Sequence, residues 1–316
     1  IQIKKDLSRT NETNFNISET QSSLYRILKA FANLDKELSY CQGMNFISGF
    51  ILYLTDFNEC DTLYLLIAMF SHTFNDKLGI RGFFTSGFPM LNYYLYLFDF
   101  YFEKRMPILK KHFEELEVPR EIWVAKWFQT LFTINMPVNV VIRIWDCLVV
   151  YGIEFIINIT LALIKSFEDD LIKLNDTIDV VDYFKAMKSS SKIELNINIE
   201  DIISKAKKII LDKETTFSIR KQFERENDLL VSETFIKYDL DDNTIFNTYF
   251  DKSVRLDSNQ TSRIASTKYS NQIEDENSFM SENLDETENI QSKVRTHTYG
   301  ALLGSIGKAK KRKSTL

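Results

Sequence analysis

Apolar residues recur at helical spacing through the first two thirds of the chain. Three segments place such residues at about i, i+3, i+4 and i+7, which is the spacing of a helix with one buried face. The three sets are Leu24, Ile27, Leu28, Phe31 and Leu34; Leu63, Leu66, Ile67 and Phe70; and Leu91, Tyr94, Leu95, Phe98 and Phe102. Strand-like alternation of apolar and polar residues is not seen. The pattern therefore predicts an all-α chain, built as an array of packed helices.

The later part of this array is marked by prolines. Pro107, Pro119 and Pro137 each precede a predicted helix, because proline is tolerated in a first helical turn. The helix after Pro137 should end near Gly152, and its apolar stripe consists of Val138, Val141, Ile142, Trp145, Leu148 and Val149. A long helix should follow to about Leu174. A last one is predicted over 199–211, with Ile202, Ile203, Ala206 and Ile210 in register.

Composition changes after residue 211, where we place the end of the packed domain. We interpret 212–256 as a peripheral extension and 257–316 as a largely disordered polar tail, because its few apolar residues cannot offset the entropy of ordering it. The tail ends in a basic cluster of Lys308, Lys310, Lys311, Arg312 and Lys313. Such a cluster can bind an anionic membrane or a nuclear-import receptor. The alternative is a solvated charged tail.

The segment from Ser39 to Gly49 joins polar residues to the most apolar predicted helix. Tyr40, Gln42 and Gly43 come directly before an apolar run that begins at Met44. Gly43 gives the backbone freedom where loop becomes helix. The amide of Gln42 can both donate and accept hydrogen bonds, which suits it to orient a water or a phosphate oxygen. The simpler interpretation is a helix cap beside a core segment.

Charge and cysteine content exclude several functions. Lys and Arg number 39 against 44 Asp and Glu, and this formal charge of −5 argues against nucleic-acid binding. The three cysteines and three histidines lack the spacing of metal ligands, so we predict no metal site. Dispersed cysteines in apolar segments predict buried thiols in a reducing compartment, and no apolar run reaches the roughly 20 residues of a membrane span. These features predict a cytoplasmic protein.

Three motifs occur in a fixed order along the chain. They are Ile3-x-x-Asp6-x-x-Arg9, Tyr40-x-Gln42-Gly43 and Arg143-Ile144-Trp145-Asp146, with Trp127-Phe128-x-x-x-Phe132 between the last two. Together with the predicted helices, this order resembles the TBC domain, a family of GTPase-activating proteins for Rab GTPases. The resemblance covers roughly residues 1–211. A further family motif, R-x-x-W, would lie upstream of Ile1.

The resemblance implies a catalytic role for two residues. Arg9 would be an arginine finger and Gln42 a glutamine finger, both supplied in trans to a Rab GTPase. Asp6 would pair with Arg9 one helical turn away, and Tyr40 and Gly43 would support the loop of Gln42. The protein would hold no cofactor of its own, because GTP and Mg²⁺ come with the partner. It would regulate vesicle trafficking from the cytoplasm or from the periphery of endomembranes.

The third motif has a structural interpretation. We expect Trp145 in the core, and Arg143 and Asp146 to stabilise the fold rather than contact the partner. Two other classes of protein fit the same helices: a catalytically silent TBC scaffold that binds a GTPase or another partner, and an unrelated helical-repeat protein. Loss of either finger would favour the scaffold, and a fixed period of about 30 to 45 residues would favour the repeat. Both fingers are present, and no such period is visible.

Overall fold

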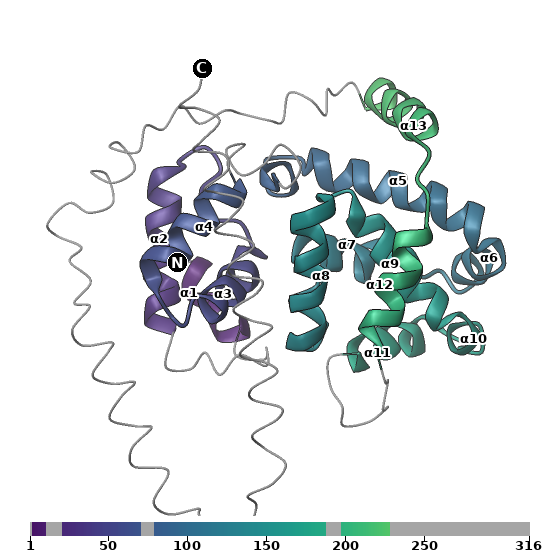
Figure 1. The fold of residues 1–316 in the computed structure, drawn as a ribbon, viewed down its shortest axis with the longest axis horizontal. Helices are drawn as coiled ribbons and strands as arrows, with labels where there is room; N and C mark the ends of the chain where they lie inside the picture. The colour runs from purple at the N-terminus through teal and green to yellow at the C-terminus, as the bar shows by residue number, and fades with distance from the viewer. Residues whose placement is uncertain (1, 11–20, 71–78, 188–196, 228–316) are drawn as a thin grey trace, which may run out of the picture. The chain divides into compact units, whose positions relative to one another are not determined.

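The described part of the chain is entirely helical in its regular structure (Figure 1). The computed structural model describes residues 2–10, 21–70, 79–187 and 197–227, without the side chains of Ser8 and Arg9. Within these ranges no strand occurs, so the predicted all-α class is confirmed there. The predictions for 257–316, including the disordered tail and its basic cluster, lie outside the described residues.

The first four helices pack on one another. They are α1 (Gln2–Thr10), α2 (Gln21–Leu34), α3 (Met44–Leu54) and α4 (Glu59–Phe70). Both α2 and α3 contact the other three helices of this group. Because it is surrounded, α3 buries every residue except Tyr53, which explains why its sequence is apolar on nearly every side.

The middle of the chain is organised by α5 (Pro89–Arg105). This helix contacts a 3₁₀ turn, η1 (Arg81–Phe83), as well as α6 (Pro107–Glu115) and α7 (Val124–Gln129). A second turn, η2 (Arg120–Ile122), leads into α7. Aromatic rings of α5, α6 and α7 cluster around Trp123, which lies between η2 and α7 and stacks on Phe184 from later in the chain with 4.8 Å between ring centroids. Large aromatic side chains therefore supply most of the core here.

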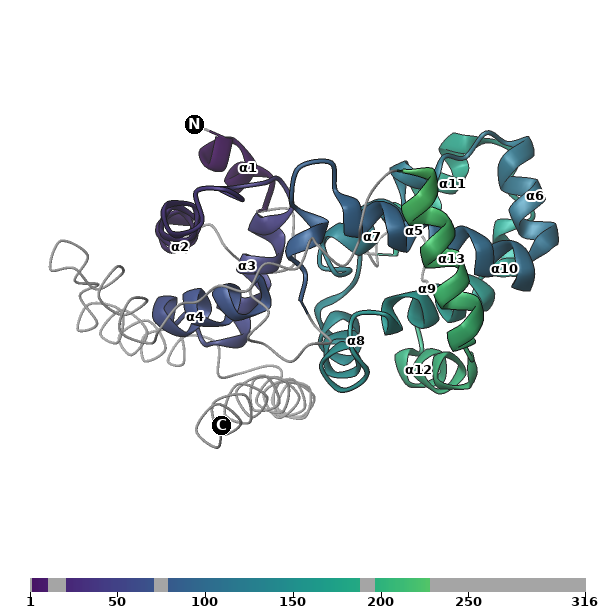
Figure 2. The same cartoon turned by 90° about the horizontal axis from the view of Figure 1, so that it is seen from above.

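Five further helices follow in the described part of the chain, and α9 is the one with the most neighbours among them. They are α8 (Val138–Tyr151), α9 (Phe155–Ser166), α10 (Glu168–Leu171), α11 (Thr177–Ala186) and α12 (Ile199–Lys208). Figures 1 and 2 place α12 beside α9, which also contacts α5, α8 and α10. Gly152 ends α8 as predicted, with φ of 93°. In the described ranges no helix is long and apolar enough to cross a membrane.

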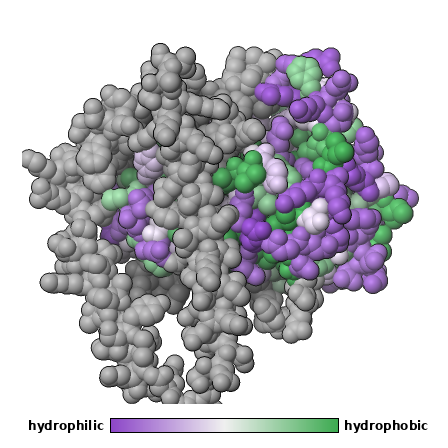
Figure 3. Space-filling model, in the orientation of Figure 1, coloured by the Kyte–Doolittle hydropathy of each residue, from purple (hydrophilic) through white to green (hydrophobic). Residues whose placement is uncertain are grey.

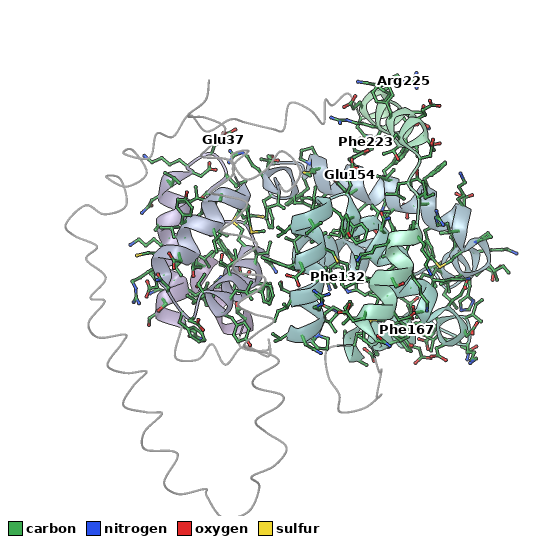
Figure 4. All side chains as sticks on the ribbon, in the orientation of Figure 1. Glu37, Phe132, Glu154, Phe167, Phe223 and Arg225 are labelled. Atoms are coloured by element: carbon green, nitrogen blue, oxygen red, sulfur yellow. The ribbon has the colours of Figure 1, made fainter. Side chains whose placement is uncertain are left out.

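A last helix, α13 (Lys213–Glu226), packs on α5. Its Phe223, labelled in Figure 4, is buried with its ring centroid 5.7 Å from that of Tyr93. A helix beyond residue 211 thus adds to the packing of α5, while the domain boundary at 211 remains a prediction. On the face drawn in Figure 3, hydrophobic residues form small areas separated by hydrophilic ones, as is usual for a protein surface.

Three local predictions are wrong. The helix expected to reach Leu174 ends at Ser166, because Phe167 leaves the helical region with φ of −117° and packs on Tyr183. Ile210 is 77% exposed instead of buried, because α12 already ends at Lys208. Of the three free cysteines only Cys147 is buried; Cys41 and Cys60 are half-buried.

Candidate functional site

Helix α1 turns polar side chains inward at the place where the Tyr40–Gly43 loop reaches it. Asp6 and Thr10 are 1% and 0% exposed. The carboxylate of Asp6 accepts hydrogen bonds from Gln2 Nε2 at 3.0 Å and from the Tyr40 hydroxyl at 3.0 Å. Arg9 lies in the same helix, but its side chain is outside what the structure describes. The predicted Asp6–Arg9 ion pair therefore remains a prediction.

Asn45 is the centre of the contacts between α1 and the loop. Its Nδ2 donates to Thr10 Oγ1 at 2.8 Å, and its Oδ1 accepts from the Gly43 N–H at 3.1 Å. The Tyr40 hydroxyl is also within 3.3 Å of that oxygen. A side chain that is only 1% exposed and bonded on both ends of its amide is held in a single orientation.

Burial raises the pKa of two side chains of this loop, Tyr40 and Cys41. Burial and the hydrogen bond to Asp6 raise the pKa of Tyr40 well above its usual value. Tyr40 therefore stays a neutral donor near pH 7, which suits a residue that positions the loop. Burial likewise raises the pKa of the Cys41 thiol, which disfavours the reactive thiolate.

Gly43 occupies a position that only glycine fits without strain. Its φ of 105° is rarely adopted by residues with a side chain. A Cβ atom there would lie 3.3 Å from Phe84 Cε1 and 3.4 Å from Gln129 Cγ. The loop thus lies closely against two other segments of the chain.

Gln42 precedes this constrained glycine and is exposed. Its neighbours Tyr40 and Gly43 are hydrogen-bonded to buried groups of α1 and α3. The arrangement exposes a carboxamide on a backbone that is hydrogen-bonded on both sides of it. Such a group can donate and accept hydrogen bonds at the same time, and so can orient a water molecule.

The third motif joins helices through one buried residue, Trp145, and one partly exposed residue, Arg143. Arg143 donates from Nη1 to Asp146 at 2.5 Å and from Nε to Glu200 of α12 at 2.6 Å. Trp145 is 2% exposed, donates from Nε1 to the Leu131 carbonyl at 3.0 Å and meets Phe50 edge-on with 4.7 Å between ring centroids. These contacts join α8 to α12 and α3.

Analysis of the sequence missed Asn45 and gave no role to Thr10, which follows Arg9. Asn45 could have been found, because it is the second residue of an apolar helix and a polar side chain there needs a partner. Thr10 gave no such signal. Among the described residues, no group of three or more His, Cys, Asp or Glu side chains could hold a metal ion.

Comparison with protein families identifies a known domain in the first part of the chain. The Rab-GTPase-TBC domain model matches residues 1–172, more than half of the 316-residue chain. The human protein "Growth hormone-regulated TBC protein 1" is 30% identical over 213 residues, which are 64% of this chain and 60% of the human one. "GTPase-activating protein GYP5" of Saccharomyces cerevisiae is 30% identical over 183 residues, 58% of this chain but 19% of that protein. The chain therefore spans at most three fifths of these two relatives.

Solved structures support the same fold. The TBC domain of the Chlamydomonas flagellar RabGAP has a TM-score of 0.53 and 21% identity, covering 65% of this chain and 66% of that one. The Ypt/Rab-GAP domain of Gyp1p has the same TM-score and identity and covers 65% and 70%. At this identity the likeness concerns the arrangement of helices alone.

Proposed function

Because this chain belongs to the Rab-GTPase-TBC domain family, we propose that it accelerates GTP hydrolysis by a Rab-type small GTPase through Arg9 and Gln42. The observation that carries this proposal is the geometry of the Gln42 loop. An exposed carboxamide sits on a backbone that Asp6 and Asn45 join to the helix of Arg9. The relatives named as GTPase-activating proteins support it further.

The two side chains would act on different parts of the reaction. Negative charge develops over the phosphoryl oxygens during hydrolysis, and a positioned guanidinium from Arg9 would stabilise it. The gain is about 10³ to 10⁵ in rate, or about 4 to 7 kcal/mol of barrier. Gln42 would orient the attacking water in place of the GTPase's own glutamine. GTP and Mg²⁺ would be carried by the GTPase.

This division of work can be tested in a panel of GTP-loaded Rab proteins. We expect wild-type protein to stimulate single-turnover phosphate release from at least one of them. Gln42→Ala should lose most of that stimulation while still binding, because the lost contact acts in the transition state. Gln222→Ala, an exposed glutamine of α13, is the matched control and should keep the full rate.

The arginine is tested in parallel. Arg9→Lys should bind the GTPase but lose most stimulation, since an ammonium cannot reproduce the planar guanidinium fork. Arg26→Lys, at an exposed position of α2, is its control.

A Rab whose intrinsic glutamine is changed to alanine should still be stimulated by the wild-type protein. If this Rab variant is not stimulated, while Gln42→Ala still stimulates wild-type Rab, then Gln42 is only a helix-end residue. Binding without stimulation of any Rab would instead indicate a silent scaffold.

A further inference from the structure

One buried arginine contacts the turn that leads into the Gln42 loop. Arg81 of η1 is 2% exposed and Asp35, directly after α2, is 3% exposed. The Arg81 guanidinium donates from Nη1 to Asp35 Oδ2, and from Nη2 to Glu37 Oε2 at 3.0 Å. Glu37, labelled in Figure 4, is largely exposed, so only one of the two acids is buried with the arginine.

Asp35 also determines the shape of this turn. Its Oδ1 accepts from the Leu38 N–H at 2.9 Å, and its backbone carbonyl accepts from the Ser39 N–H at 2.6 Å. Ser39 has a φ of 54°, in the left-handed region, immediately before Tyr40. The carboxylate that binds Arg81 therefore also fixes the backbone just before Tyr40.

The same segment supports the far end of the loop. Phe84, which follows η1, lies against Gly43, where a Cβ would be 3.3 Å from its ring. The ring of Phe84 also packs on Phe70 of α4, with 5.1 Å between centroids. Residues 81–84 thus contact the chain on both sides of Gln42, at the turn before it and at the glycine after it.

A buried ion pair is a costly way to stabilise a fold, because an apolar pair of similar volume often serves as well or better. Its hydrogen bonds are directional, which apolar contacts are not. We propose that Arg81 and Asp35 are positioning residues for Gln42: their ion pair holds the loop so that the carboxamide reaches the attacking water. This inference rests on the proposed function.

The test separates positioning from general stability by comparing two backgrounds. In otherwise wild-type protein, Asp35→Asn should lower kcat for hydrolysis by a GTP-loaded Rab about 10- to 100-fold, since a displacement of about 1 Å can cost about 100-fold. KM should change less than about twofold. In the Gln42→Ala background the same substitution should change kcat less than about twofold, because the group it positions is already missing.

Two further variants complete the experiment. Arg81→Lys keeps the buried positive charge beside Asp35 but loses the fork that reaches Glu37, so it should fold even where Asp35→Asn melts below the assay temperature. Like Asp35→Asn, Arg81→Lys should lower kcat in otherwise wild-type protein and change it less than about twofold in the Gln42→Ala background. Asp99→Asn is the matched control, because it removes a half-buried ion pair to Arg120 of η2. Any change it causes in kcat should be the same in both backgrounds.

Each result decides the matter. Equal losses of kcat in the two backgrounds, or no loss in the wild-type background at an unchanged melting temperature, would overturn the inference alone. A Gln42→Ala variant with the wild-type rate would overturn the glutamine role in the proposed function, and this inference with it.

Discussion

The interior of α1–α4 differs in kind from the aromatic cluster around α5 and α7. Among the first four helices and their connections, buried polar side chains are common: Asp6, Thr10, Asp35, Asn45, Ser48, Thr55 and Thr62. Around α5 and α7 the interior is rich in aromatic rings that contact one another: Phe98, Phe102, Phe113, Trp123, Trp127 and Phe128.

The difference indicates a division of labour. Apolar packing is strong but weakly directional, whereas buried hydrogen bonds are modest in net energy and specify one geometry. The aromatic cluster therefore suits stability, and the polar network suits the placement of Gln42 relative to α1. Trp145 of α8 links the two regions, because it touches Phe50 of α3 and donates to the Leu131 carbonyl just after α7.

The largest loss of stability is expected when the Trp145 ring, which links the two regions, is removed. Trp145→Ala should lower the free energy of unfolding by about 3 to 5 kcal/mol, because it leaves a large cavity and an unpaired Leu131 carbonyl. Thermal unfolding by circular dichroism measures this. Trp145→Phe keeps a ring and should cost clearly less. A Trp145→Ala protein with an unchanged melting curve and no activity would place Trp145 at the interface with the GTPase.

The polar network should respond differently. Asn45→Ala should cost about 3 kcal/mol, since the Gly43 N–H and the Thr10 hydroxyl lose a buried partner. Unlike Trp145→Ala, it should also lower stimulation at temperatures where the protein is still folded. Asn92→Ala, at an exposed position of α5, is the control. Full stimulation by folded Asn45→Ala would argue against a positioning network.

The helices and the apolar core were largely predictable from sequence. The stripe on 138–149 follows from periodicity, and the buried run from Met44 follows from its continuous apolar sequence. Periodicity fails where a helix ends early: Phe167 and Ile210 continue the apolar pattern beyond the ends of α9 and α12. Helix ends depend on local backbone geometry and tertiary contacts, which a spacing rule does not contain.

The candidate site was predictable only in part. Motifs single out Asp6, Tyr40 and Gln42, but they do not show that Asp6 and Tyr40 are bonded to each other across 34 positions. The Arg81–Asp35 pair joins residues 46 positions apart, and neither lies in a motif. Such pairs are decided by the packing of α1, α2 and η1. A single sequence holds no local signal for them.

The loop itself can be probed with two glycines. Gly43→Ala should cost about 2 kcal/mol, because its φ of 105° strains any residue with a side chain. Gly87→Ala is a matched control, since Gly87 also has a positive φ of 78°, but a Cβ added there would meet no atom within 4 Å. Backbone strain should lower the stability of both variants, whereas crowding by Phe84 and Gln129 should lower only that of Gly43→Ala. If Gly43→Ala and Gly87→Ala lose equal stability and stimulate the GTPase at equal rates, the contacts of Phe84 and Gln129 with Gly43 do not support the loop.

The smallest effect is expected at the surface pair between α8 and α12. Arg143 donates to Glu200, and this hydrogen bond lowers the pKa of the Glu200 carboxyl. A group whose pKa is lower in the folded state stabilises the fold above its unfolded pKa of about 4.3, and that contribution is lost as the pH falls through the folded value. Glu200 is largely exposed, so Glu200→Gln should cost less than about 1 kcal/mol at pH 7.

Melting temperatures between pH 7 and pH 3 would measure this contribution. The difference between wild type and Glu200→Gln should shrink as the pH falls below about 4.3, because the wild-type carboxyl then becomes neutral as well. Glu114→Gln, an exposed acid paired with Lys110 within α6, is the control for a pair that joins no two helices. A difference that persists at pH 3 would mean that Glu200 acts through packing, and the ion pair between α8 and α12 would then have no measurable role.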